Sequence, residues 1–94
     1  MHFEWDAAKA AKNLRKHGIS FHEAVSAFYD PLATTGDDPD HSEDEERFIT
    51  FGFSSAGRLI VVCHTEHDDV IRIISARRMT HTEREIYEEG KIPQ

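Results

Sequence analysis

The sequence has one cysteine, three prolines and no long apolar run among its 94 residues. The single thiol, Cys63, excludes a disulfide framework and a zinc site built from several cysteines. No segment approaches the roughly 20 apolar residues that a membrane helix requires, and Met1–Trp5 leads into a charged segment without the apolar core of a signal peptide. We therefore expect a cytoplasmic protein that makes no membrane contact.

Positive charge is also scarce, because 11 Lys and Arg residues face 18 Asp and Glu residues, for a net charge of −7. Proteins that bind nucleic acids usually show a basic surface, so this balance argues against an RNA partner. However, seven of the acids lie between Asp37 and Glu46, a segment without Lys or Arg. The rest of the chain carries 11 acidic and 11 basic residues and is electrically balanced.

Two helices are predicted near the N-terminus, after a short strand at residues 3–5. Asp6 can cap the first helix, which Gly18 ends after about His17. Ser20 and Glu23 have the spacing of a capping box and indicate a second helix. The apolar residues of the first helix form a modest stripe: Ala7, Ala8, Ala11 and Leu14.

The second half of the chain is predicted to form a sheet and a final helix. Residues 32–46 have little apolar content and indicate a long solvated loop that contains the acidic run. Thr80 or Thr82 can cap a helix that extends through Glu89, and residues 91–94 are expected to fray. Three β-rich runs, at residues 47–53, 58–64 and 70–77, have the spacing of an antiparallel meander.

These elements predict an α+β fold in a single domain, residues 1–94. Two N-terminal helices pack on an antiparallel sheet of three to four strands, and a C-terminal helix follows. The second and third β-runs are apolar at nearly every position, which indicates that both faces of the sheet are covered. We expect the two helices to cover one face, and the last helix together with a partner or substrate to cover the other.

Four arginines cluster on this predicted sheet: Arg47, Arg72, Arg77 and Arg78. A guanidinium offers paired donors that suit phosphate oxygens and stays charged when partly desolvated, which favours phosphoryl-transfer chemistry. The structural alternative is that Arg47 and Arg72 form ion pairs at the sheet edge with acids such as Glu45, Glu46 or Asp69.

Cleavage of RNA without a metal needs a base for the 2′-hydroxyl, cationic donors for the phosphate and an acid for the leaving 5′-oxygen. Lys16, His17, Glu46, His64 and Tyr87 are candidates for proton transfer, since each is predicted at the end of an element beside the sheet. Each also has a structural explanation: His17 as a cation at a helix C-terminus, His64 as a polar residue at the sheet edge, and Tyr87 as a half-buried packing residue.

Other chemistry is disfavoured. The residues His64, Glu66, His67 and His81 match no strong metal motif and are typical of a polar turn. The acidic run lacks the ligand spacing of a calcium loop, and the sequence has no glycine-rich phosphate loop. Cys63 lies in an apolar run and is expected to be a small core residue rather than a nucleophile. We therefore expect no metal and no cofactor.

Several short motifs occur in a fixed order along the chain: FEWD at 3–6, KHG at 16–18, ISARR at 74–78 and ERE-x-YE at 83–88. In these motifs, and over about residues 2–89, the sequence resembles the BrnT family. The resemblance implies the toxin of a type II toxin–antitoxin pair, with a RelE-like ribonuclease fold. It also implies a BrnA-like antitoxin as partner, through which alone the complex would contact DNA.

The resemblance points to catalytic residues Lys16, His17, Arg47, Arg72, Arg77 and Tyr87, and we add Lys12 and Arg78 as RNA-binding residues. Under this hypothesis Arg72 and Arg77 hold the scissile phosphate, and Arg47 positions the RNA. Lys16 or His17 assists proton transfer, and Tyr87 stacks on a base. Because Arg72 and Arg77 are five positions apart, an unbroken strand would point them to opposite faces. We therefore expect a bend near Ser75–Ala76.

The predicted function is a metal-independent endoribonuclease that arrests growth and is held silent in a hetero-oligomer with its antitoxin. The alternative is a catalytically silent binding module that keeps the fold and the antitoxin surface, because the acidic run would repel RNA. A stand-alone DNA-binding regulator is disfavoured, since no helix-turn-helix pair displays a basic recognition helix.

Overall fold

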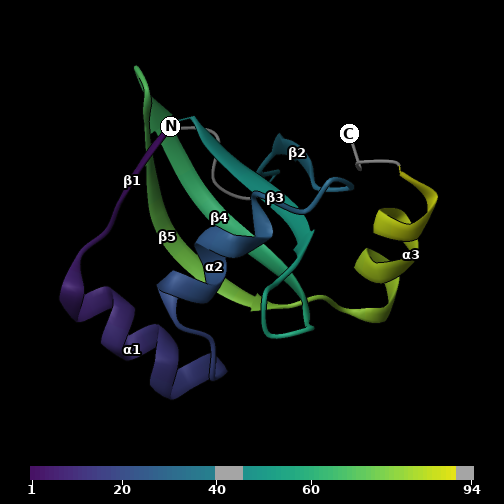
Figure 1. Cartoon of the computed structure of the whole chain (residues 1–94), viewed down its shortest axis with the longest axis horizontal. Helices are drawn as coiled ribbons and strands as arrows, with labels where there is room; N and C mark the ends of the chain where they lie inside the picture. Colours follow the sequence, from purple (N-terminus) through teal and green to yellow (C-terminus); the bar gives the residue numbers. More distant parts are fainter. Residues whose placement is uncertain (40–45, 91–94) are drawn as a thin grey trace.

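A computed structural model describes residues 1–39 and 46–90 of the chain. The elements follow in the order β1 (His2–Glu4), α1 (Ala7–His17), α2 (Phe21–Ala27), β2 (Thr34–Asp37), β3 (Arg47–Phe53), β4 (Leu59–His67), β5 (Val70–Arg78) and α3 (His81–Glu89). The strands form one sheet in the order β1-β5-β4-β3-β2. Figure 1 shows α2 over one face of this sheet with α1 next to it, and α3 at the opposite side of the view from α1.

The predicted meander is confirmed, since β3, β4 and β5 pair antiparallel in sequence order. The prediction of a purely antiparallel sheet with three to four strands is wrong, because the sheet has five strands and is mixed. β1 pairs parallel with β5 at one edge, and β2 pairs antiparallel with β3 at the other. β2 lies within the segment predicted as a solvated loop. Its sequence, TTGD, shows no alternation of apolar and polar residues, so the sequence does not indicate a strand here.

The helix boundaries agree with the sequence. The Asp6 carboxylate accepts a hydrogen bond from the Lys9 amide (3.0 Å), and Gly18 ends α1 in the left-handed conformation with φ of 71°. The Ser20 hydroxyl caps α2, but the Glu23 side chain does not complete the expected capping box and contacts Arg58 and Ser54 instead. α3 has the complete capping box. None of the helices in residues 1–39 and 46–90 is long and apolar enough to cross a membrane.

The predicted apolar stripe of α1 is wrong, because Ala7, Ala8, Ala11 and Leu14 are exposed. The buried residue of this helix is Asn13, whose side-chain nitrogen donates to the carbonyls of Ile19 and Ala76 (both 2.9 Å). Its side-chain oxygen accepts from the Ala76 amide (3.1 Å). β1 ends opposite Arg72, so the amide of Asn13 supplies the partner that Ala76 lacks at the edge of β5.

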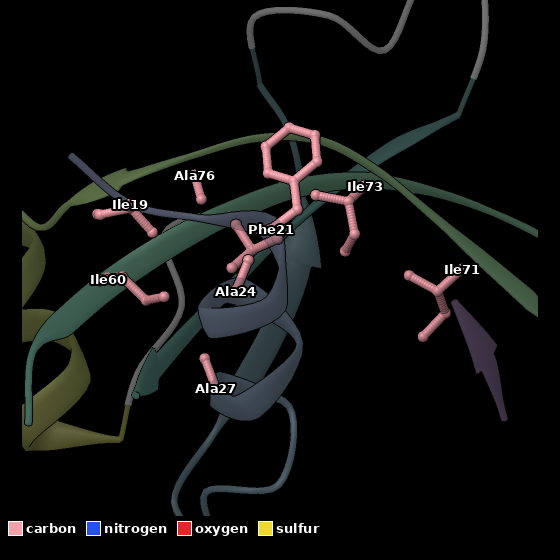
Figure 2. Close-up of a cluster of buried hydrophobic side chains, with 9 residues drawn as sticks. Ile19, Phe21, Ala24, Ala27, Ile60, Ile71, Ile73 and Ala76 are labelled. Atoms are coloured by element: carbon pink, nitrogen blue, oxygen red, sulfur yellow. The ribbon is translucent and has the colours of Figure 1, made fainter. Parts of the chain in front are cut away.

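The hydrophobic core lies between α2 and the sheet, as Figure 2 shows. It consists of Ile19, Phe21, Ala24, Ala27, Ile60, Val62, Ile71, Ile73 and Ala76. The two layers approach closely at Gly52, where an added Cβ would lie 2.5 Å from the carbonyl oxygen of Ala27. Only glycine allows α2 to lie so near β3. We call this side of the sheet the helix-covered face.

Candidate active site

A β-bulge brings Arg72 and Arg77 to the same face of the sheet. Cys63 pairs with Ser75 while the next residue, His64, pairs with Ile73, so β5 contains one extra residue at this point. The extra residue reverses the alternation of side chains along the strand. The bend expected near Ser75–Ala76 is therefore present as a bulge immediately before Ser75.

The cross-strand register extends this face to Arg47. Arg47 lies opposite Thr65, which lies opposite Arg72, and residues directly opposite one another point to the same side of a sheet. Arg77 lies opposite Val61, four residues from Thr65, so the two rows are about 13 Å apart along β4. We call the side that carries Arg47, Arg72 and Arg77 the arginine face. It lies opposite the helix-covered face.

Arg72 and Arg77 both form ion pairs in this structure. The Nη1 atom of Arg72 lies 3.4 Å from Glu4 Oε1 on the adjacent strand β1, and both side chains are about half exposed. Arg77 donates two parallel hydrogen bonds to Glu83, at 2.6 Å and 2.8 Å. The structural alternative anticipated an ion pair for Arg72, and the partner of Arg72 is Glu4. Asp69 instead lies 3.9 Å from the N-terminal amine.

The Arg77–Glu83 pair borders a pocket of about 210 Å³. The pocket is lined by Asp38, Pro39, Ile49, Val61, Cys63, Ser75, Arg77 and Glu83. The hydrogen bonds from Arg77 lower the pKa of Glu83, and those to Glu83 raise the pKa of Arg77. The pair is therefore fully ionised at neutral pH and holds the first turn of α3 against the sheet.

Asp38 is a second acidic residue that lines this pocket. It is buried, with 6% of its surface exposed, although it belongs to the run predicted as a solvated loop. It accepts a hydrogen bond from the Cys63 thiol at 3.4 Å. Burial raises the pKa of Cys63 to about 11, and the bond to Asp38 adds to this effect. The thiol is protonated at neutral pH, which agrees with the expectation that Cys63 is not a nucleophile.

His64 lies inside the protein and not at a sheet edge, so that expectation is wrong. It sits on the central strand β4 with 1% of its surface exposed, between the rings of Phe28 and Phe48. Its Nε2 atom is 2.7 Å from the Thr50 hydroxyl. Burial lowers the pKa of His64 to about 4. In this conformation its ring has no access to a substrate, so it cannot exchange protons with one.

Tyr87 lies half-buried on α3, where its hydroxyl donates to Asp30 Oδ2 at 2.5 Å. Burial raises the pKa of Tyr87 to about 12, and the contact with Asp30 reinforces the shift. The phenol is therefore a poor base at neutral pH. The same oxygen of Asp30 accepts from the Phe53 amide at 2.8 Å, so this carboxylate joins the end of β3 to α3.

The remaining predicted residues lie away from the arginine face. Lys12, Lys16 and His17 belong to α1, which packs on β5 from the helix-covered side through Asn13. Arg78 lies opposite Ile60, so it points to the helix-covered face. The structure thus brings together Arg47, Arg72 and Arg77 and separates them from the cations of α1.

Comparison with known proteins assigns the family. The family model described as "Ribonuclease toxin, BrnT, of type II toxin-antitoxin system" matches residues 5–83. The chain belongs to the BrnT family. A crystal structure of the Brucella abortus ribonuclease toxin BrnT has the same fold, with a TM-score of 0.67 and 20% sequence identity over 86% of this chain and 99% of that one. A search of curated proteins found no match.

Two acidic residues of this BrnT-family chain were missed as parts of the site. Glu83 stands in the ERE motif, but its pairing with Arg77 requires the turn between β5 and α3. Asp38 belongs to the acidic run that was predicted as a solvated loop, so the sequence did not distinguish it from its acidic neighbours. Its burial follows from its position just after β2. Within residues 1–39 and 46–90, no three His, Cys, Asp or Glu side chains are grouped so that they could hold a metal ion.

Proposed function

We propose that this chain is a RelE-like, metal-independent endoribonuclease that acts in the cytoplasm and is silenced in a hetero-oligomer with a BrnA-like antitoxin. The observation that carries the proposal is the arginine face. A bulge in β5 is needed to align Arg72 with Arg77, and Arg47 completes the group from β3. Three guanidiniums on one face suit a polyanion whose phosphate gains charge during cleavage.

In the proposed reaction, the 2′-hydroxyl of one ribose gives its proton to a general base, and its oxygen attacks the adjacent phosphorus. A 2′,3′-cyclic phosphate forms, the bond to the 5′-oxygen breaks, and that oxygen takes up a proton. Arg77 and Arg72 would bind the phosphate oxygens, and Arg47 would position the strand. RNA must first displace the carboxylates of Glu83 and Glu4, which occupy two of these guanidiniums in the free protein.

The structure places the proposed proton-transfer groups apart from the arginine face. Lys16 and His17 stay in the proposal, but α1 packs on the opposite side of the sheet from Arg77. They can act on the same RNA only if the strand passes around the end of the sheet. Tyr87 would stack on a base only after its bond to Asp30 opens.

The activity is tested with purified protein and a labelled single-stranded RNA in buffer containing EDTA. We expect cleavage by the wild type and a fall of about 100-fold or more in kcat/KM for Arg77→Ala, because a donor to the transition-state charge is lost. Arg72→Ala is expected to lower kcat/KM in the same direction. Lys9→Ala, which removes an exposed cation from the first turn of α1, is the matched control. Cleavage that disappears only in EDTA, or full activity of both arginine variants, would overturn the proposal.

A second function is favoured by one specific observation: Arg72 and Arg77 are already neutralised by carboxylates in the free protein. Under this alternative the chain is a catalytically silent module that retains the fold and binds the antitoxin. Wild-type protein that binds the antitoxin but leaves RNA intact, and growth that continues after its induction, would select this alternative.

The proposed antitoxin partner is supported by a loosely attached helix and by exposed apolar side chains. No residue of α3 is buried, and Tyr29, Leu32 and Phe53 leave half or more of their surfaces exposed. With the antitoxin at 100 times its Kd, we expect Tm to rise by about 10 °C or more. Differential scanning fluorimetry measures this shift. An unchanged Tm at saturation would contradict the proposed partner.

A further inference from the structure

A second pocket, of about 320 Å³, lies at the end of the sheet where the β3–β4 turn meets the connection from β5 to α3. It is lined by Phe53, Gly57, Arg58, Leu59, Arg78, Met79 and Arg84. Three of its lining residues are arginines, and none is acidic. The chain has a net charge of −7, so three arginines around one pocket are unusual for this protein and indicate a site for an anion.

The first pocket has the opposite balance of charge. The pocket beside Arg77 is lined by two carboxylates, Asp38 and Glu83, and by one cation. Even when Glu23 and Glu88, which pair with Arg58 and Arg84, are counted, cations outnumber carboxylates at the second pocket, whereas carboxylates outnumber cations at the first. A polyanion would therefore meet a more favourable potential at the second pocket. The second pocket is therefore the better place for first contact with a phosphate backbone.

Arg58 forms the fixed wall of this basic pocket. Its guanidinium donates to both carboxylate oxygens of Glu23 and to the carbonyl of Gly18 (3.0 Å). The bond to Gly18 also fastens the end of α1 beside the pocket. Lys16 and His17 precede Gly18 in the last turn of α1.

Arg78 and Arg84 are the cations that remain available. Arg78 makes no ion pair in the described part of the chain, although its charge helps to lower the pKa of Glu23. Arg84 pairs with Glu88 one turn away on α3 (2.9 Å), but both side chains are more than half exposed. Exposed pairs of this kind contribute little and exchange readily for a phosphate.

Phe53 adds an aromatic surface to the charge. Phe53 is 50% exposed, and its amide donates a hydrogen bond to Asp30. Leu59 and Met79 form the neighbouring apolar wall, and the Met79 amide donates to the Leu59 carbonyl (3.1 Å). A backbone held in place beside an exposed ring suits the stacking of an unpaired base.

We propose that this pocket is a binding subsite for single-stranded RNA, in which Arg78 and Arg84 hold phosphates and Phe53 stacks on a base. The subsite rests on the proposed function, because it takes the same substrate. It guides the strand around the end of the sheet, between the cations of α1 and the arginine face. The combination of aromatic ring and available guanidinium favours RNA over an acidic protein segment, which offers charge without bases to stack.

The test measures fluorescence anisotropy of a labelled 2′-O-methyl oligonucleotide, which binds but cannot be cleaved, across a range of salt concentrations. We expect Arg78→Gln to weaken binding about tenfold and to reduce the salt slope by about 0.7, the value for one phosphate contact with a single strand. Phe53→Leu keeps an apolar wall and should weaken binding about fivefold with an unchanged slope. Lys9→Gln is the control for loss of one positive charge elsewhere.

Unchanged affinity in both Arg78→Gln and Phe53→Leu overturns the subsite. If the wild type still cleaves RNA in that case, the proposed function stands without it. Weaker binding of the antitoxin by these variants, with unchanged affinity for the oligonucleotide, would assign the pocket to the antitoxin and overturn the RNA subsite. A wild type that neither binds the oligonucleotide nor cleaves RNA removes both proposals.

Discussion

His64 is the residue whose acid–base chemistry is most altered by the fold. Its Nε2 atom bonds to Thr50, whose hydroxyl lies 2.7 Å from that of Thr35, while its Nδ1 atom is buried without a partner in the described structure. Burial lowers its pKa from 6.5 to about 4. The ring is therefore neutral when folded, and protonation at lower pH favours the unfolded chain.

This shift predicts how stability depends on pH. A group with a lowered folded pKa contributes stability above its unfolded pKa and loses it as pH falls toward the folded value. We expect the free energy of unfolding to drop by about 2 kcal/mol between pH 7 and pH 5. The carboxylates of Glu23 and Glu83 remain ionised in this window, because their pKa values are lowered below 4.5.

Urea denaturation at several pH values checks this prediction, with His64→Gln as the non-titrating comparison. The variant is expected to be less stable at pH 7 and to show a flatter profile between pH 7 and pH 5. Equal slopes for the two proteins would refute the prediction. An NMR titration of the His64 ring in the wild type reports its folded pKa directly, even if the variant does not fold.

Among the elements, α3 is attached by polar contacts rather than by a core. No residue in it is buried, and within the described residues its side chains bond to the rest of the protein from Glu83 to Arg77 at its first turn and from Tyr87 to Asp30 near its end. Helices attached in this way open at a lower free-energy cost than the strands of the core. Because Glu83 occupies Arg77, the position of α3 also controls access to the arginine face.

The substitution Glu83→Gln tests whether α3 controls access to the arginine face. We expect faster hydrogen exchange in α3, since the charged bonds to Arg77 are weakened, and tighter binding of the uncleavable oligonucleotide, since Arg77 is released. Glu85→Gln removes the same charge from the same helix, where Glu85 pairs with the exposed His81 (2.9 Å), and is the matched control. Equal changes in the two variants would show that net charge, and not the release of Arg77, sets the affinity.

At the scale of the whole molecule, an acidic protein is proposed to bind a polyanion. Seven acids are concentrated between Asp37 and Glu46, and the remaining charge is balanced. The repulsion they exert on RNA acts over about 10 Å at 0.1 M salt and is screened as ionic strength rises. The acidic run should therefore weaken association most at low salt.

Neutralising part of this run measures the effect. Replacing Glu43, Asp44 and Glu45 by their amides should tighten oligonucleotide binding severalfold at about 50 mM salt, with the difference disappearing at about 500 mM. Amides at Glu66, Asp68 and Asp69, at the β4–β5 turn, remove the same charge elsewhere. If both triple variants gain equally, the run has no special role and only the net charge matters.

The sequence by itself determined the elements whose signals are local. Asp6 and Gly18 delimit α1, Thr80 begins α3, and the three β-rich runs became β3, β4 and β5. Caps and periodic patterns act within a few residues, so they can be read without the rest of the chain. The family motifs are likewise linear, and their order along the chain is enough to indicate the family.

Tertiary structure decided the rest, because the deciding contacts join residues far apart in the chain. β1 pairs with β5 across about two thirds of the sequence, and the buried amide of Asn13 satisfies Ala76, 63 residues away. The bulge that aligns Arg72 with Arg77 exists only through the register of β5 against β4. Such pairings depend on which backbone groups still lack a hydrogen-bond partner after the helices have packed. A pattern within a few residues of the sequence cannot predict these long-range pairings.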